Sequence, residues 1–89
     1  MFENKNFIIQ YLQDDEIREE NMHKFSLDIK DFDTPLVTIK YDCRKEKIVS
    51  KWIEEKDNDN IPKNHVAYKL VDLVEFEICS IFKFIIEHL

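Results

Sequence analysis

Apolar and polar residues alternate along two stretches of the chain. Between positions 23 and 30, Phe25, Leu27 and Ile29 alternate with polar or charged residues, and the same pattern recurs from 37 to 41. A period of two is typical of a strand that buries one face and exposes the other. The sequence therefore predicts two strands that share one apolar face.

The connection between these strands sets their expected pairing. If residues 31–35 form a five-residue loop, the strands run antiparallel and their apolar residues lie on the same face of a sheet. The predicted pairs are Ile29 with Val37, Leu27 with Ile39, and Phe25 with Tyr41.

A third run, from 47 to 53, allows two interpretations. It can bury Ile48 and Trp52, or it can bury Val49 and Ile53. A short loop at 43–46 followed by uninterrupted pairing favours the first, because cross-strand neighbours must share a face. The predicted pairs are Asp42 with Lys47, Tyr41 with Ile48, Ile39 with Ser50, and Val37 with Trp52. Trp52 is therefore expected on the apolar face. The charged residues expected on the opposite face are Lys24, Lys40, Asp42, Lys47 and Lys51.

The N-terminal run 6–12 is rich in aromatic and β-branched residues, which favour a strand. Ile8, Ile9 and Leu12 also fit one face of a helix, so the helical alternative stays open. An acidic connection at 13–21 separates this run from the next predicted strand.

The segment from Asn64 to Leu89 has the apolar spacing of an amphipathic helix, and Asn64, which follows Pro62, is placed to cap its first turn. The residues expected to pack on a sheet are Ala67, Val71, Val74, Ile78, Ile81, Phe82, Ile85 and Leu89. The helix has more apolar residues than this face uses. The surplus residues on the opposite side are Val66, Leu73, Phe76 and Phe84.

Two interpretations of this surplus stay open. The helix can sit in a deep groove whose rim covers more of its circumference. Alternatively, Leu73, Phe76 and Phe84 can contact a second copy or a target protein, because soluble monomers seldom expose large contiguous apolar patches. A homodimer is the favoured form of the second interpretation, since two-fold symmetric dimers are the commonest closed assembly.

Taken together, these elements predict a single domain over residues 1–89 with an α+β fold. A small antiparallel β-meander of three to four strands is expected to pack against one long C-terminal α-helix.

Composition narrows the classes of function. The chain contains no glycine, which excludes glycine-rich phosphate-binding loops, and its net charge of −6 makes free nucleic acid a poor partner. Cys43 and Cys79 lack the spacing of a metal site, and no uncharged run is long enough to cross a membrane. We therefore expect a cytoplasmic protein, in the host cytoplasm if the chain is viral, with reduced thiols.

The candidate chemical groups do not form a recognisable site in the sequence. His23, His65 and His88 are not spaced as helical metal ligands, and the acidic stretch 57–60 lacks the glycine and the terminal glutamate of a calcium loop. Cys43 lies beside basic residues but has no evident base. The sequence therefore predicts no catalytic residue, no metal site and no cofactor, and a protein that is not an enzyme.

Acidic clusters are the remaining candidate for recognition. They comprise Asp14, Asp15, Glu16, Glu19 and Glu20, and a second group of Glu54, Glu55, Asp57 and Asp59. Such runs often only solvate a surface, but they can also mimic a nucleic-acid backbone and bind a basic groove.

These features predict a small acidic protein that binds a basic protein surface, dimerises through its helix and makes no direct contact with nucleic acid or membrane. In size and acidity it is typical of phage or mobile-element inhibitors of the anti-CRISPR or anti-restriction type, an analogy of class and not of motif. The alternatives are an immunity protein or antitoxin that neutralises one toxin, and a structural dimeric subunit.

Overall fold

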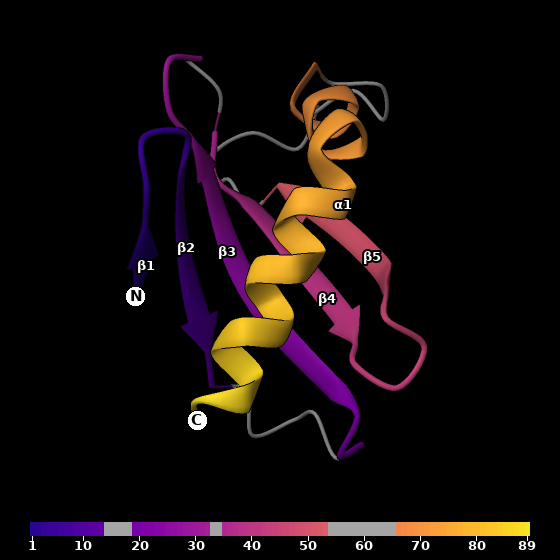
Figure 1. The fold of residues 1–89 in the computed structure, drawn as a ribbon. Helices are drawn as coiled ribbons and strands as arrows, with labels where there is room; N and C mark the ends of the chain where they lie inside the picture. The colour runs from indigo at the N-terminus through magenta and orange to yellow at the C-terminus, as the bar shows by residue number, and fades with distance from the viewer. Residues whose placement is uncertain (14–18, 33–34, 54–65) are drawn as a thin grey trace.

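The computed structural model describes residues 1–13, 19–32, 35–53 and 66–89. It has an α+β fold in which one long C-terminal helix packs against an antiparallel sheet, as predicted (Figure 1). The five strands lie side by side in chain order, as in a meander. The elements are β1 (Phe2–Glu3), β2 (Phe7–Leu12), β3 (Met22–Ile29), β4 (Val37–Asp42), β5 (Lys47–Ile53) and α1 (Val66–Glu87).

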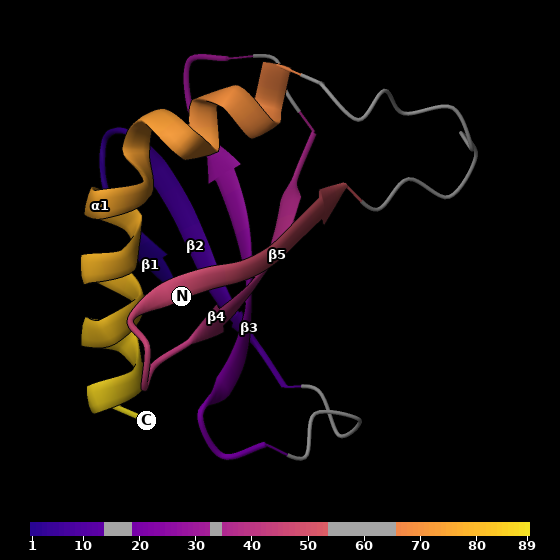
Figure 2. The same cartoon turned by 90° about the vertical axis from the view of Figure 1, so that its right-hand side faces the viewer.

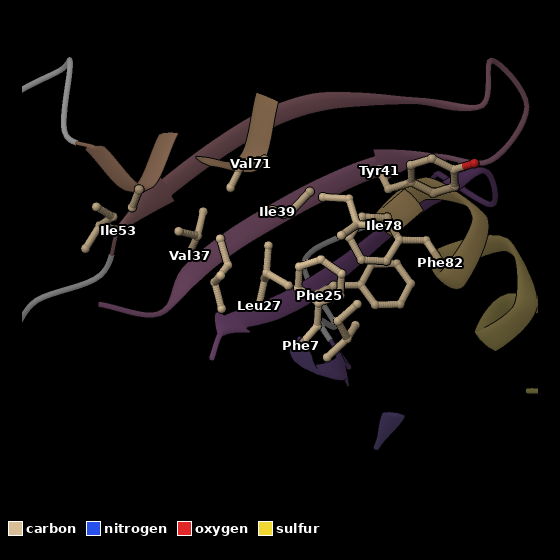
Figure 3. Close-up of a cluster of buried hydrophobic side chains, with 13 residues drawn as sticks. Phe7, Phe25, Leu27, Val37, Ile39, Tyr41, Ile53, Val71, Ile78 and Phe82 are labelled. Carbon is tan, nitrogen blue, oxygen red and sulfur yellow. The ribbon is translucent and has the colours of Figure 1, made fainter. Parts of the chain in front are cut away.

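Helix α1 crosses one face of the sheet and leaves the other face uncovered by any described helix (Figure 2). The core lies between the two layers, with Phe25 of β3 stacked on Phe82 of α1 at 4.2 Å between ring centroids (Figure 3). The buried apolar side chains are Phe7, Ile9, Phe25, Leu27, Ile29, Val37, Ile39, Tyr41, Ile53, Ala67, Val71, Ile78 and Phe82.

The N-terminal region forms two strands. The predicted strand at 6–12 is confirmed as β2, and β1, a strand beyond the expected three to four, pairs with Ile8 and Ile9. The side chain of Asn4 closes the turn between them, because its Oδ1 accepts hydrogen bonds of 2.7 Å from the backbone N–H groups of Asn6 and Phe7. An asparagine turn of this kind replaces the glycine that many tight turns use.

The β3–β4 register is shifted by two residues from the prediction. Phe25 lies opposite Ile39, and Leu27 lies opposite Val37. Ile29 was predicted to pair with Val37 of β4, but it pairs with Phe7 of β2 on its other side. The predicted faces were still correct, because a shift of two residues keeps every side chain on its original side.

The β4–β5 register was predicted correctly only beside the turn. Tyr41 pairs with Ile48 as expected, but a β-bulge follows, in which Val49 is the extra residue. Beyond the bulge Thr38 pairs with Trp52 and Val37 with Ile53. The predicted inward position of Trp52 is therefore wrong, and Ile53 occupies the core instead.

The same bulge moves Lys51 to the helix side of the sheet, not the outer face as predicted. Its Nζ forms an ion pair with the carboxylate of Asp72 on α1. This contact joins the edge strand to the helix.

The helix face matches the prediction except at its C-terminal end. Ala67, Val71, Ile78 and Phe82 are buried, but Leu89 is 70 % exposed, because α1 ends at Glu87. The predicted start at Asn64 and Pro62 lies outside the described residues.

Candidate protein interface

Four apolar side chains project from α1 on the side away from the sheet, and we call them the α1 stripe: Val66, Leu73, Phe76 and Phe84. Phe76 is 90 % exposed and Leu73 is 81 % exposed, so no described part of the chain covers them. In the described structure no groove rim therefore surrounds these two residues. The first interpretation of the surplus apolar residues does not apply to them. Exposed apolar groups of this size on a regular helix are typical of a contact surface.

The spacing of the stripe follows from the helical repeat. Leu73, Phe76, Ser80 and Phe84 are three or four residues apart, and such positions lie along one side of a helix. Ser80 is the small residue between the two phenylalanines, and its hydroxyl donates a hydrogen bond of 3.2 Å to the carbonyl of Phe76. The stripe is therefore a row of apolar groups with a narrow centre.

Charged residues flank the stripe, with carboxylates in the majority. The exposed charged residues of α1 are Lys69, Asp72, Glu75, Glu77, Lys83 and Glu87. Lys83 forms an ion pair of 2.7 Å with Glu46 in the β4–β5 turn, and this contact raises the pKa of the Lys83 ammonium. Beside the ion pair, Glu46 adopts a positive φ of 56°, a backbone conformation that costs non-glycine residues some energy.

A hollow of about 310 Å³ lies between the β4–β5 turn and the middle of α1, lined by Glu46, Lys47, Glu75, Phe76 and Cys79. A smaller hollow of about 240 Å³ shares Glu46, Phe76 and Cys79 with it. Burial, with a contribution from Glu75, raises the pKa of the Cys79 thiol to about 11. The thiol is thus protonated at neutral pH, which makes it a poor nucleophile.

Tyr41 lines the smaller hollow, and its buried hydroxyl has no hydrogen-bond partner among the described residues. The side chain itself is fully buried against Phe82, with ring centroids 5.4 Å apart (Figure 3). Burial, followed by the charge of nearby acidic groups, raises the pKa of this hydroxyl to about 12.

We expect Tyr41→Phe to stabilise the protein by about 1 kcal/mol, because the change removes a buried polar group that lacks a partner. Chemical denaturation of the two proteins measures this difference. Tyr68→Phe is the matched control, since the hydroxyl of Tyr68 accepts a hydrogen bond of 3.2 Å from the backbone N–H of Ile53. That variant should lose about 1 kcal/mol. Equal losses of stability in both variants would contradict the conclusion that the Tyr41 hydroxyl lacks a hydrogen-bond partner.

The outer face of the sheet carries Trp52 beside lysines. The Lys24 ammonium lies 5.5 Å from the centre of the indole ring, and Lys24 stands opposite Lys40 across β3 and β4. Trp52 was expected on the apolar face, and that prediction was wrong because it depended on the uninterrupted β5 register. The indole is half-buried and interacts within the chain.

The predicted acidic residues are described only in part. Glu19 and Glu20 are exposed, next to β3. The other members lie outside the described residues: Asp14, Asp15, Glu16, Glu54, Glu55, Asp57 and Asp59. Their role in binding stays a prediction.

The described residues contain no cluster of three or more His, Cys, Asp or Glu side chains that could hold a metal ion. Burial lowers the pKa of His23, whose Nδ1 lies 3.0 Å from the hydroxyl of Tyr11, so this imidazole is neutral at physiological pH. No helix within these residues combines the length and apolarity required to cross a membrane.

The α1 stripe and its flanking charges are thus the surface of the described structure best suited to binding. Comparisons with protein-family models, with curated proteins and with solved structures find no match to this chain.

Proposed function

We propose that this chain is a non-enzymatic protein-binding protein whose binding surface is the α1 stripe. The observation that carries the proposal is the exposure of Leu73 and Phe76, 81 % and 90 %, on a helix whose opposite face is fully packed. Removing such side chains from water favours association by about 25 cal/mol for each Å² of apolar surface buried. A folded helix also loses little conformational entropy on binding.

The excess of carboxylates determines which protein surfaces the chain can approach. A net charge of −6 attracts basic proteins and repels nucleic acid, whose backbone is itself anionic. We therefore propose an inhibitor that binds the basic surface of an enzyme acting on nucleic acid, of the anti-CRISPR or anti-restriction type. The exposed Glu19 and Glu20, together with the acidic residues outside the described structure, are the proposed contacts to that surface.

An immunity protein or antitoxin is the second candidate, and the same acidic charge favours it. The two differ in the number and kind of partners. An inhibitor of host defence should bind a nuclease or a nuclease complex, whereas an immunity protein should bind one toxin alone.

The test compares the wild-type chain with Leu73→Glu/Phe76→Glu in affinity capture from the source cell, followed by calorimetric titration of each captured protein in purified form. We expect the variant to bind at least about 100-fold more weakly, since two central apolar contacts are each worth roughly 2 kcal/mol or more. A captured enzyme is then assayed with and without the chain, and loss of its activity supports inhibition.

Leu36→Glu/Val49→Glu is the matched control, because it places the same charges at exposed apolar positions away from α1. This control should bind as the wild type does. If both double variants retain every partner, or lose the same ones equally, the α1 stripe is not the binding surface.

A further inference from the structure

We propose that the α1 stripe binds the α1 stripe of a second copy, with the two helices antiparallel. The inference rests on the proposed function, because it names one occupant for the same surface. In the resulting dimer the second copy occupies the α1 stripe, and the target binds the acidic residues, among them the exposed Glu19 and Glu20 of each copy. The Leu73→Glu/Phe76→Glu variant then loses its target because the dimer that presents these residues no longer forms.

The shape of the stripe is complementary to itself. A two-fold axis midway between Phe76 and Ser80 places each phenylalanine opposite the small serine of the other copy. A large side chain then enters the space above a small one, as in the interdigitated packing of paired helices. The hydroxyl of Ser80 already donates to the carbonyl of Phe76, so excluding water from this position leaves no hydroxyl without a partner.

The same axis aligns opposite charges. In this register Lys69 lies opposite Glu87 of the second copy, and symmetry repeats the pair at the other end of the interface. Both residues are exposed at opposite ends of α1.

A parallel pair of helices would bring like charges together. Lys69 would lie beside the Lys69 of the second copy, and Glu87 beside its Glu87, which destabilises a helix interface. Charge complementarity therefore favours the antiparallel arrangement. The two copies repel at long range because each carries −6, but salt screens such repulsion beyond about 8 Å at physiological ionic strength.

Sedimentation equilibrium of purified chains tests the proposal through a charge-reversal series. The wild type should be dimeric. Lys69→Glu should weaken the dimer roughly tenfold, because two attractive pairs become repulsive, and Glu87→Lys should do the same. The double variant Lys69→Glu/Glu87→Lys should recover wild-type affinity, since each pair is restored with its signs exchanged.

Mixing the two single variants provides a second readout. Across such a heterodimer every proposed pair again joins an ammonium to a carboxylate, so the mixture should associate more tightly than either variant alone. Circular dichroism melts of each variant establish that it is folded, and the unmixed variants serve as the references.

Each contrary outcome identifies what fails. A wild-type chain that stays monomeric at its highest soluble concentration overturns the second-copy proposal and leaves the capture test of the proposed function intact. A dimer that Leu73→Glu/Phe76→Glu does not dissociate overturns this interface, and unchanged partner capture by that variant separately overturns the proposed function. A dimer that dissociates in that variant but shows no recovery in the charge-reversed double variant overturns the antiparallel register.

Discussion

Replacing Phe82 with alanine should destabilise the fold by about 3–5 kcal/mol, the usual cost of removing a buried phenylalanine. Phe82 is fully buried, and its ring stacks on Phe25 at 4.2 Å and lies 5.4 Å from Tyr41 (Figure 3). It thus joins the C-terminal half of α1 to Phe25 of β3 and Tyr41 of β4. Urea denaturation followed by circular dichroism measures the loss.

Phe84→Ala is the matched control, because it removes the same side chain from the same helix two residues away. Both variants are measured at a protein concentration low enough for the chain to be monomeric, so that the proposed contact between two α1 stripes does not contribute. Phe84 is 53 % exposed, and we expect its loss to cost less than about 1 kcal/mol. The difference between the two losses of stability distinguishes the packed face of α1, which stabilises the fold, from the α1 stripe, which does not. Comparable losses in the two variants would show that the exposed face also stabilises the monomer.

The fold class could be predicted because the face of each element depends on periodicity and not on exact register. The β3–β4 pairing differs by two residues from the prediction, yet Phe25, Leu27 and Ile39 are buried as expected. An even shift preserves the face of a strand. Helix α1 was predicted for the same reason, since its buried positions are four or seven residues apart and so lie on one face of a helix.

The β-bulge could not be predicted, because nothing in the sequence marks Val49 as an extra residue. Bulges often contain glycine, and this chain has none. Uninterrupted pairing was therefore the simpler expectation, and it placed Trp52 in the core. Tertiary packing decided otherwise, since Ile53 fits the space beneath α1 and the larger indole lies on the outer face beside Lys24.

The α1 stripe was predictable as an excess over what one helix face can bury. Its exposure depends on whether another segment covers it, and periodicity contains no information on that point. The structure shows that Leu73 and Phe76 are exposed and that no described residue covers them. The acidic clusters are different, because a run of charges has the same pattern whether it binds a partner or only meets water.

Enlarging Ala67 to leucine should destabilise the protein by about 1–3 kcal/mol, the usual cost of adding methylenes to a packed core. Ala67 is the only alanine in the chain and is fully buried in the first turn of α1. The buried residues of the helix grow in size from Ala67 through Val71 and Ile78 to Phe82. The smallest of these side chains thus lies at the start of α1, where a larger one must push the helix away from the sheet.

Val66→Leu is the control, because it adds a methylene to the neighbouring residue, which is 54 % exposed. It should change stability by less than about 0.5 kcal/mol. Since the position of Ala67 sets how α1 lies on the sheet, its enlargement should also displace the α1 stripe relative to the β4–β5 turn and weaken the Lys83–Glu46 ion pair. Thermal melts report the loss of stability, and the amide resonance of Glu46 reports the displacement. An unchanged melting temperature would show that the helix can shift at its start without cost, and that Ala67 does not fix its position.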